Sequence, residues 1–384
     1  MDFVFEKTDR NLTSGVQNGG MKSPLWIWLL WLLLLVVGAS PARSDQIDTY
    51  IREQMQRQRI PGLSLAVIRD GRIVRAGGYG LANVELGVPA TAETVYQSGS
   101  VGKQFTATVV MLLVEEGKLS LDGPISRYLD GTPPAWKEIT IRHLLTHTSG
   151  IPDYESKGDL SLDYRRDYTD DELVALAEKT PLAFAPGEKW SYSNTGYVLL
   201  GIIVNKVSGR FYGDILQNRV FGPLGMKSSR IISDRDIVLH RAAGYQLVDG
   251  LLKNQGYVSP SLNRTADGSL YLTVGDLAKW DRALYTDKVL TRASLEQIWT
   301  PVQLNSGQTA PYGFGWRLAS VGSHRLIEHS GQWQGFTSQI SRYVDDRLTV
   351  VVLTNLANAK PEVIAHTIAG FLLPQLGRAA SGGE

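Results

Sequence analysis

The feature that most restricts the fold is the placement of strand-like segments at both ends of the chain, around a mainly helical middle. Residues 63–69 and 73–79 are joined by Asp70-Gly71, a two-residue turn typical of a β-hairpin. Four more strand patterns occur near the other end, at residues 312–320, 324–331, 335–344 and 348–356. Together the two ends predict an α/β fold with one antiparallel sheet that both terminal regions complete.

Between and beside these strands, apolar spacing predicts several helices. The segment 103–117 is apolar on most faces and ends at a glycine, which indicates a buried helix. The other helices are expected at residues 45–58, 170–179, 196–207, 274–285 and 360–376. They would flank the sheet and form an inserted, mostly helical lobe, with a small-molecule cleft between lobe and sheet.

The composition predicts one compact domain, from 45 to 377, and a flexible tail from 378 to 384. The 39 basic and 38 acidic residues are well mixed, giving a net charge of +1 and no basic stripe for a nucleic acid. This balance favours a small-molecule or short-peptide substrate. The chain has no cysteine, which excludes disulfides, thiolate metal sites and a cysteine nucleophile.

The N-terminal region carries an export pattern. A polar extension, 1–20, precedes Met21, which is an alternative start. Residues 21–44 then combine a lysine, an apolar run at 25–37 and the small residues Val37-Gly38-Ala39, as a signal peptide does. The run is shorter than the roughly 20 residues that a membrane-spanning helix needs. We expect a secreted or periplasmic protein; the alternative is a membrane anchor formed by 25–37.

The first chemical motif is Ser100-Val101-Gly102-Lys103. If a helix begins near Ser100, positions i and i+3 share a face, so the hydroxyl and the amine can meet. A serine becomes a nucleophile only when a neighbouring base takes its proton. Alone, this motif has an equally simple interpretation, a helix-capping serine followed by a solvated lysine.

Two later motifs favour the catalytic interpretation. They are Tyr192-Ser193-Asn194 and His329-Ser330-Gly331. In this order the three motifs resemble those of the serine hydrolases related to penicillin-binding proteins and class C β-lactamases. The stretches 143–154 and 312–316 resemble this family too. The resemblance covers nearly the whole chain after the signal segment. It implies a β-lactamase/transpeptidase-like fold and a serine hydrolase without metal or organic cofactor.

The resemblance also implies roles. Ser100 would form the acyl-enzyme, with Lys103 and Tyr192 as proton-transfer partners. Asn194 and the basic position His329 would bind the substrate, and Gly331 would let it approach the strand. The backbone N–H of Gln332 would complete an oxyanion hole with that of Ser100. Trp316 and Trp333, near this strand, are the tryptophans best placed to line a pocket.

One position departs from the β-lactamases, which usually have lysine where this chain has His329. Histidine titrates near neutral pH, so it is a less constant anchor for a substrate carboxylate. We therefore expect an exported serine hydrolase acting on D-amino-acid peptides or amides, or on small esters. The alternatives are a β-lactamase proper and a non-catalytic protein that binds peptidoglycan fragments or a partner.

A zinc interpretation of "HLLTH" is weaker. His143 and His147 have the i, i+4 spacing of zinc ligands, but leucine occupies the place of the glutamate base. Both histidines are expected to be structural.

Overall fold

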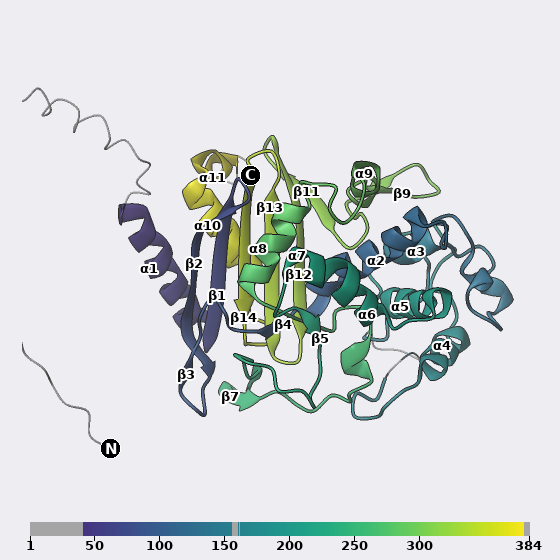
Figure 1. Ribbon diagram of the computed structural model, residues 1–384, viewed down its shortest axis with the longest axis horizontal. Coiled ribbons are helices and arrows are strands. Elements are labelled where there is room, and N and C mark those ends of the chain that lie inside the picture. Colours follow the sequence, from purple (N-terminus) through teal and green to yellow (C-terminus); the bar gives the residue numbers. More distant parts are fainter. Residues whose placement is uncertain (1–40, 156–159, 161, 380–384) are drawn as a thin grey trace, which may run out of the picture. The chain divides into compact units, whose positions relative to one another are not determined.

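The computed structural model describes residues 41–155, 160 and 162–379, drawn in colour in Figure 1. The predicted polar extension 1–20, the apolar run 25–37 and the last five residues of the predicted tail lie outside the described residues. In chain order the helices and strands are α1 (Pro41–Gln58), β1 (Gly62–Arg69), β2 (Arg72–Asn83), β3 (Val88–Pro89), β4 (Tyr96–Gln97), α2 (Lys103–Glu115), α3 (Ile141–Leu145), α4 (Asp170–Lys179), α5 (Asn194–Ser208), α6 (Tyr212–Leu216), α7 (Gly222–Leu224), β5 (Arg230–Ile231), β6 (Tyr245–Val248), β7 (Leu251–Asn254), β8 (Leu270–Leu272), α8 (Val274–Ala283), α9 (Arg292–Ile298), β9 (Val302–Gln303), β10 (Thr309–Ala310), β11 (Arg317–Val321), β12 (His324–Trp333), β13 (Phe336–Tyr343), β14 (Leu348–Thr354), α10 (Pro361–Leu372) and α11 (Pro374–Ala379).

The central sheet joins the two ends of the chain, as the sequence predicts. Its strand order is β11-β12-β13-β14-β1-β2-β3, and every neighbouring pair is antiparallel. Strand β1 pairs with β14, with Leu63 opposite Thr354 and Arg69 opposite Leu348. Both strands are buried on both faces, which explains why they are continuous apolar runs without alternation.

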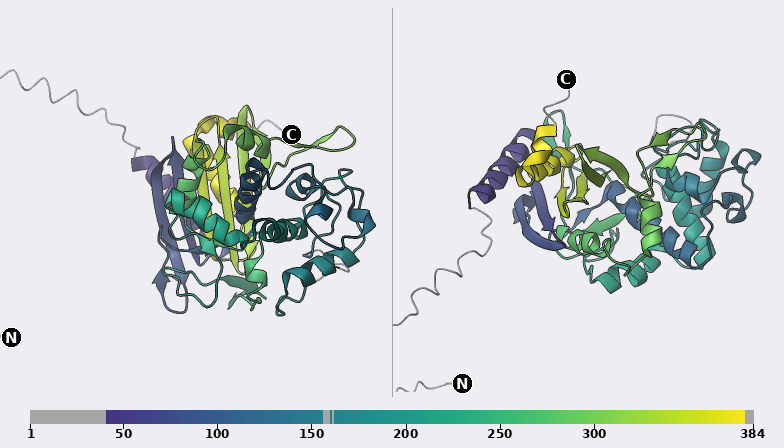
Figure 2. Two further views of the ribbon diagram at one scale, coloured as in Figure 1. Left: turned by 45° about the vertical axis from the view of Figure 1, so that its right-hand side comes forward. Right: turned by 90° about the horizontal axis from the view of Figure 1, so that it is seen from above.

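Helices cover the sheet on both faces (Figure 2). On one face α1 and α10 pack through apolar residues that include Ile51, Ile364 and Ile368, all fully buried. The larger core lies on the other face and includes α2, α5 and α8. Helix α2 is buried along nearly its whole length, as its apolar sequence predicts. The helices α3, α4 and α5 form the inserted lobe beside the sheet (Figure 1).

Helix α2 begins at Lys103, as predicted, and Ser100 lies just before it in a separate 3-10 turn, Gly99–Gly102. The helix expected at 360–376 is instead two helices, α10 and α11, with Leu373 between them. No helix among the described residues has both the length and the apolar character that a membrane span requires.

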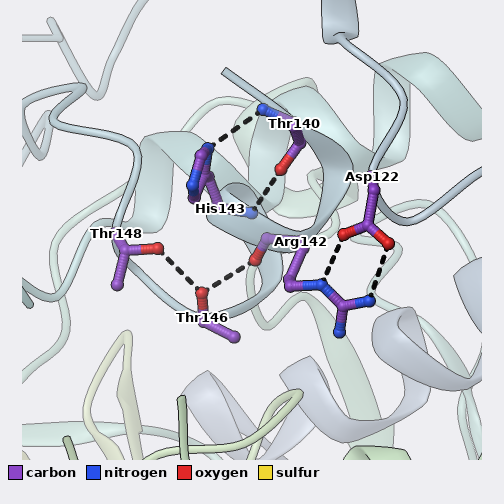
Figure 3. Close-up of polar contacts among 6 residues, drawn as sticks. All are labelled: Asp122, Thr140, Arg142, His143, Thr146 and Thr148. Atoms are coloured by element: carbon purple, nitrogen blue, oxygen red, sulfur yellow. Dashed lines mark hydrogen bonds and ion pairs between the residues drawn. The ribbon is translucent and has the colours of Figure 1, made fainter. Parts of the chain in front are cut away.

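The short helix α3 shows how one of the two candidate zinc-ligand histidines is used (Figure 3). Thr140 and His143 cap the helix reciprocally: the Thr140 hydroxyl accepts from the His143 N–H, and His143 Nδ1 accepts from the Thr140 N–H. Arg142 on the same turn makes a bidentate ion pair with Asp122. His143 is therefore a capping residue.

A buried ion pair ties α8 to the sheet. Arg342 on β13 donates to Asp281 on α8 over 2.7 Å, and both side chains are almost completely buried. Thr349 donates a second hydrogen bond to the same carboxylate oxygen. The guanidinium also faces the rings of three aromatic residues, Tyr285, Trp299 and Trp316.

Replacing Asp281 by alanine should lower the free energy of unfolding by about 3–5 kcal/mol, because it leaves the Arg342 charge buried without a counter-ion. Chemical denaturation would measure the loss. The control is Glu296→Ala, which breaks the exposed pair with Arg292 and should cost less than about 0.5 kcal/mol. Equal effects of the two substitutions would contradict this account.

Candidate active site

The site is built around a buried lysine. The Lys103 side chain has no solvent exposure, yet its amine has three acceptors: Ser100 Oγ at 3.0 Å, Asn194 Oδ1 at 2.6 Å and the backbone carbonyl of Asp267 at 2.6 Å. Three acceptors match the three protons of an ammonium group. The structure thus brings the predicted serine and lysine into direct contact.

Ser100 is held by close backbone packing. It lies in the turn Gly99–Gly102, and Gly99 has φ of +49°, a conformation that side chains other than glycine rarely adopt. A Cβ added to Gly99 would lie 2.3 Å from the backbone nitrogen of Gln332, and one added to Gly331 would lie 2.9 Å from the backbone nitrogen of Ser100. The turn and strand β12 are therefore in direct contact. The two N–H groups predicted to form the oxyanion hole belong to these touching segments.

Tyr192 lies beside the lysine without a hydrogen bond to it. Lys103 Nζ is 4.9 Å from the centre of the Tyr192 ring, and the Tyr192 hydroxyl has no hydrogen-bond partner among the described residues. The ring packs against His147 at 4.2 Å between centroids. Hydrogen bonds of catalytic groups often tighten only when substrate binds, so the absence of this bond does not contradict the proton-transfer role, which stays a prediction.

Asn194 connects the lysine to the start of α5. Its side-chain oxygen accepts from Lys103, while its Nδ2 donates to Asp153 Oδ2 and its backbone N–H donates to Asp153 Oδ1. Asp153 thereby fixes the Asn194 amide with its oxygen toward the lysine. Desolvation in the site raises the pKa of Asp153 above its ordinary value.

His329 differs from its expected role as a titrating, basic anchor. It is 1 % exposed, and desolvation lowers its pKa to about 3. Its Nδ1 lies 2.6 Å from the Ser330 carbonyl, which can only accept, so Nδ1 carries the proton. Nε2 is then the acceptor for the Tyr312 hydroxyl at 2.8 Å. The residue is a neutral, doubly bonded histidine, and it contributes no positive charge to the cleft.

His147, the second candidate zinc ligand, is also structural. It is buried, its Nδ1 accepts from the Ser193 N–H, and desolvation lowers its pKa well below the ordinary value. The described residues include no group of three histidine, aspartate or glutamate side chains arranged to hold a metal ion.

Two carboxylates that the sequence analysis did not single out line the cleft with Ser100: those of Glu155 and Asp267. Asp267 is 7 % exposed and accepts a 2.5 Å hydrogen bond from the Tyr154 hydroxyl. Desolvation in the cleft, with the nearby carboxylates of Asp267 and Asp153, raises the pKa of Glu155 to about 7. This wall of the cleft is acidic.

The loop that carries Asp267 is fixed from several sides. Its four successive carbonyls, from residues 265 to 268, each accept a hydrogen bond from a side chain. The donors are, in that order, Tyr212, Thr106, Lys103 and Ser98. The carbonyl that accepts the hydrogen bond of Lys103 is thus part of a segment in which every carbonyl is hydrogen-bonded.

The cleft also carries a cation that the sequence motifs do not reveal. Arg317, on β11, lines a cleft region together with Ser100, Tyr192 and His329. Of the two tryptophans expected near a pocket, Trp333 lines the cleft. The expectation for Trp316 is wrong: this side chain is buried in the core against Arg342.

Comparisons with known proteins agree with this geometry. The model of the family described as Beta-lactamase matches residues 47–373. A penicillin-binding protein of Bacillus subtilis (strain 168) is 34% identical over 327 residues, which cover 82% of this chain and 72% of that protein. A D-aminopeptidase of Brucella anthropi is 28% identical over 83% of this chain and 61% of its own length, so this chain spans about three fifths of that relative.

Solved structures are also similar to this chain over most of its length. The octameric penicillin-binding protein homologue from Pyrococcus abyssi superimposes with a TM-score of 0.76 and 33% identity, over 86% of this chain and 77% of that one. The D-amino acid amidase from Ochrobactrum anthropi SV3, complexed with L-phenylalanine, has a TM-score of 0.74 and 26% identity, over 88% of this chain and all of that one.

The His329 ring should stay neutral between pH 5 and 8, because its pKa in the folded protein is about 3. Nitrogen NMR of the histidine rings across this range should show one ring with a protonated Nδ1 and an unprotonated Nε2 that does not titrate. Assignment with His329→Gln would identify the signal. A titration midpoint near 6.5 for this ring would contradict the structure.

The same pKa shift makes a stability prediction. His329 takes up a proton near pH 6.5 in the unfolded chain and only near pH 3 in the folded protein, so protonation favours unfolding as the pH falls below 6.5. The His329→Gln variant should therefore lose less stability than the parent protein between pH 6.5 and 4, as measured by denaturation at each pH. An unchanged pH dependence would contradict this.

Proposed function

The chain belongs to the beta-lactamase family of serine hydrolases, and from that premise we propose that it hydrolyses amides or short peptides of amino acids with a free ammonium group, through an acyl-enzyme on Ser100. The observation that carries the proposal is the Ser100–Lys103 contact in a cleft with an acidic wall. Small esters of the same acyl groups would react by the same route.

The chemistry needs no group from outside the chain except water. Ser100 Oγ attacks the substrate carbonyl, and its proton passes to the Tyr192 oxygen, which acts as a phenolate beside the Lys103 ammonium. The Ser100 and Gln332 N–H groups stabilise the oxyanion. The C–N bond then breaks, and the leaving nitrogen takes the proton from Tyr192. Water attacks the resulting ester, its proton returns to Ser100 Oγ through the same pair, and the acid is released.

The charges of the cleft support the choice of substrate. Glu155 and Asp267 present carboxylates beside Ser100, and a substrate ammonium would neutralise them. Arg317, which lines the larger part of the cleft, suits a carboxylate in the leaving group, as a peptide would provide. A D-aminopeptidase and a D-amino acid amidase are among the similar proteins, which supports the D configuration for the acyl group.

Export is a second part of the proposal. The lysine, the apolar run at 25–37 and the small residues 37–39 favour cleavage of a signal peptide. The mass of the mature protein, recovered from outside the cytoplasm, would test it. A chain that keeps residues 25–37 and remains in the membrane fraction would support the anchor instead.

Ser100→Ala should abolish hydrolysis of D-alanine p-nitroanilide and leave the fold intact, because the acyl acceptor is removed. Turnover would be followed by release of p-nitroaniline, and the acyl adduct by intact-protein mass after a rapid acid quench. The matched control is Ser320→Ala, an exposed serine on β11, which should keep full activity. Retained turnover in Ser100→Ala would contradict the assignment of Ser100 as the nucleophile.

Glu155→Gln should raise KM for D-alanine p-nitroanilide, because it removes a charge that attracts the ammonium. In the parent protein Glu155 is protonated as the pH falls through about 7, so kcat/KM should decline below pH 7 by up to about tenfold per pH unit. The N-acetylated substrate, which has no ammonium, is the control. If both substrates show the same effect of Glu155→Gln, then Glu155 does not bind the ammonium.

A further inference from the structure

The cleft divides at Ser100 into two parts of different size. The inner pocket, with a volume of about 20 Å³, is lined by Ser100, Glu155, Asp267 and Trp333 among others. Among the residues that the structure describes, the outer pocket, of about 340 Å³, shares Ser100, Glu155, Asn194 and Gln332 with it. Trp333 and Asp267 belong to the inner pocket alone, while Tyr192 and Arg317 belong to the outer pocket alone.

This division orients the substrate, if the proposed function holds. Tyr192 gives its proton to the leaving nitrogen, and Tyr192 lines only the outer pocket. The leaving group therefore lies in the outer pocket, where about 340 Å³ leave room for a further residue or peptide. Arg317 lines this pocket together with two carboxylates, those of Glu155 and Glu362. The acyl group, on the other side of the reacting carbonyl, must place its substituents toward the inner pocket.

The inner pocket has room for about one water-sized group. A methyl group has nearly the size of a water molecule, and an ammonium group is of similar size. We propose that Trp333 limits the acyl group to that of glycine or alanine, by closing the inner pocket against longer side chains. The carboxylates of Asp267 and Glu155 line this pocket too, and their charge attracts the ammonium.

Trp333 forms a fixed wall. Its Nε1 donates to Asn263 Oδ1 over 3.0 Å, and Asn263 is itself buried and bonded to Asp234. The Tyr164 ring packs on Trp333 with 5.9 Å between centroids. Because the indole is held both by a hydrogen bond and by an aromatic contact, it cannot move aside for a larger substrate without breaking these interactions.

The aromatic contacts continue from Trp333 through Tyr164 to the acidic wall. Tyr164 contacts Tyr154 at 6.5 Å between centroids, and the Tyr154 hydroxyl donates to Asp267. Trp333, which limits the size of the acyl group, and Asp267, which attracts its ammonium, are thus parts of one connected surface. A change of Trp333 should alter the preference for acyl size far more than it alters the preference for an ammonium.

The experiment measures kcat/KM for p-nitroanilides of D-alanine, D-2-aminobutyrate, D-norvaline and D-leucine, and of glycine. The parent protein should lose at least about tenfold in kcat/KM from alanyl to norvalyl. Trp333→Ala should raise kcat/KM for the norvalyl substrate by about tenfold or more and change the glycyl value little. Trp333→Phe keeps an aromatic wall and should retain the order of the parent protein.

Two further variants complete the test. Trp333→Leu opens the pocket with less loss of packing and serves if the alanine variant does not fold by circular dichroism. Arg317→Gln, in the outer pocket, should keep the order of acyl preference and instead weaken the preference for leaving groups that carry a carboxylate. Comparison of D-alanyl-D-alanine with D-alaninamide measures that preference.

The outcomes separate the two proposals. Equal kcat/KM across the acyl series in the parent protein, or an unchanged order in a folded Trp333→Ala or Trp333→Leu variant, would overturn the role of Trp333 and leave the proposed function standing. If the parent protein hydrolyses none of the anilides and forms no Ser100 adduct with them, the proposed function fails, and the acyl-size limit fails with it.

Discussion

The rest of the site depends on a single constraint, the need to satisfy a buried ammonium group. Moving a charged amine out of water costs several kcal/mol unless hydrogen bonds and charges replace the water. The hydrogen-bond acceptors of Lys103 come from three separate segments: the serine turn, the start of α5 and the loop before β8. A fold that failed to bring these segments together would leave the charge uncompensated, so the lysine and the architecture of the cleft require each other.

Glycines bring the serine turn into contact with strand β12 and with the loop before β8. Gly99, Gly268 and Gly331 each lie so close to neighbouring backbone that an added Cβ would be 2.1–2.5 Å from a backbone atom. Small residues here allow the serine turn to lie directly on the strand. This contact brings together, before any substrate arrives, the two segments that carry the Ser100 and Gln332 N–H groups. If these groups form the proposed oxyanion site, that site needs little rearrangement during the reaction.

The sequence predicts the parts of the structure that depend on local pattern or on spacing. The terminal strands, the buried helix α2 and the Ser100–Lys103 contact all follow from such patterns. Residues brought together only by tertiary structure escape this reasoning. Asp267 and Glu155 are 112 positions apart in the chain and meet only in the folded protein, where the Tyr154 hydroxyl donates to Asp267 and both carboxylates line one pocket. His329 was expected to titrate, and only its burial against Tyr312 shows that it stays neutral.

The neutrality of His329 changes the distribution of charge along the cleft. A lysine at this position would place a second cation beside Lys103, and the buried surroundings of Tyr312 and the Ser330 carbonyl offer it no counter-ion. Histidine avoids this cost by remaining uncharged, and the positive charge of this wall is carried instead by Arg317 on the neighbouring strand. If this arginine holds the carboxylate of the leaving group, the distance between that carboxylate and the reacting carbonyl is set by β11 as well as β12. Under the proposed function, the chain would therefore separate two tasks that one lysine would combine: a neutral side chain supports the strand, and an exposed arginine attracts the substrate.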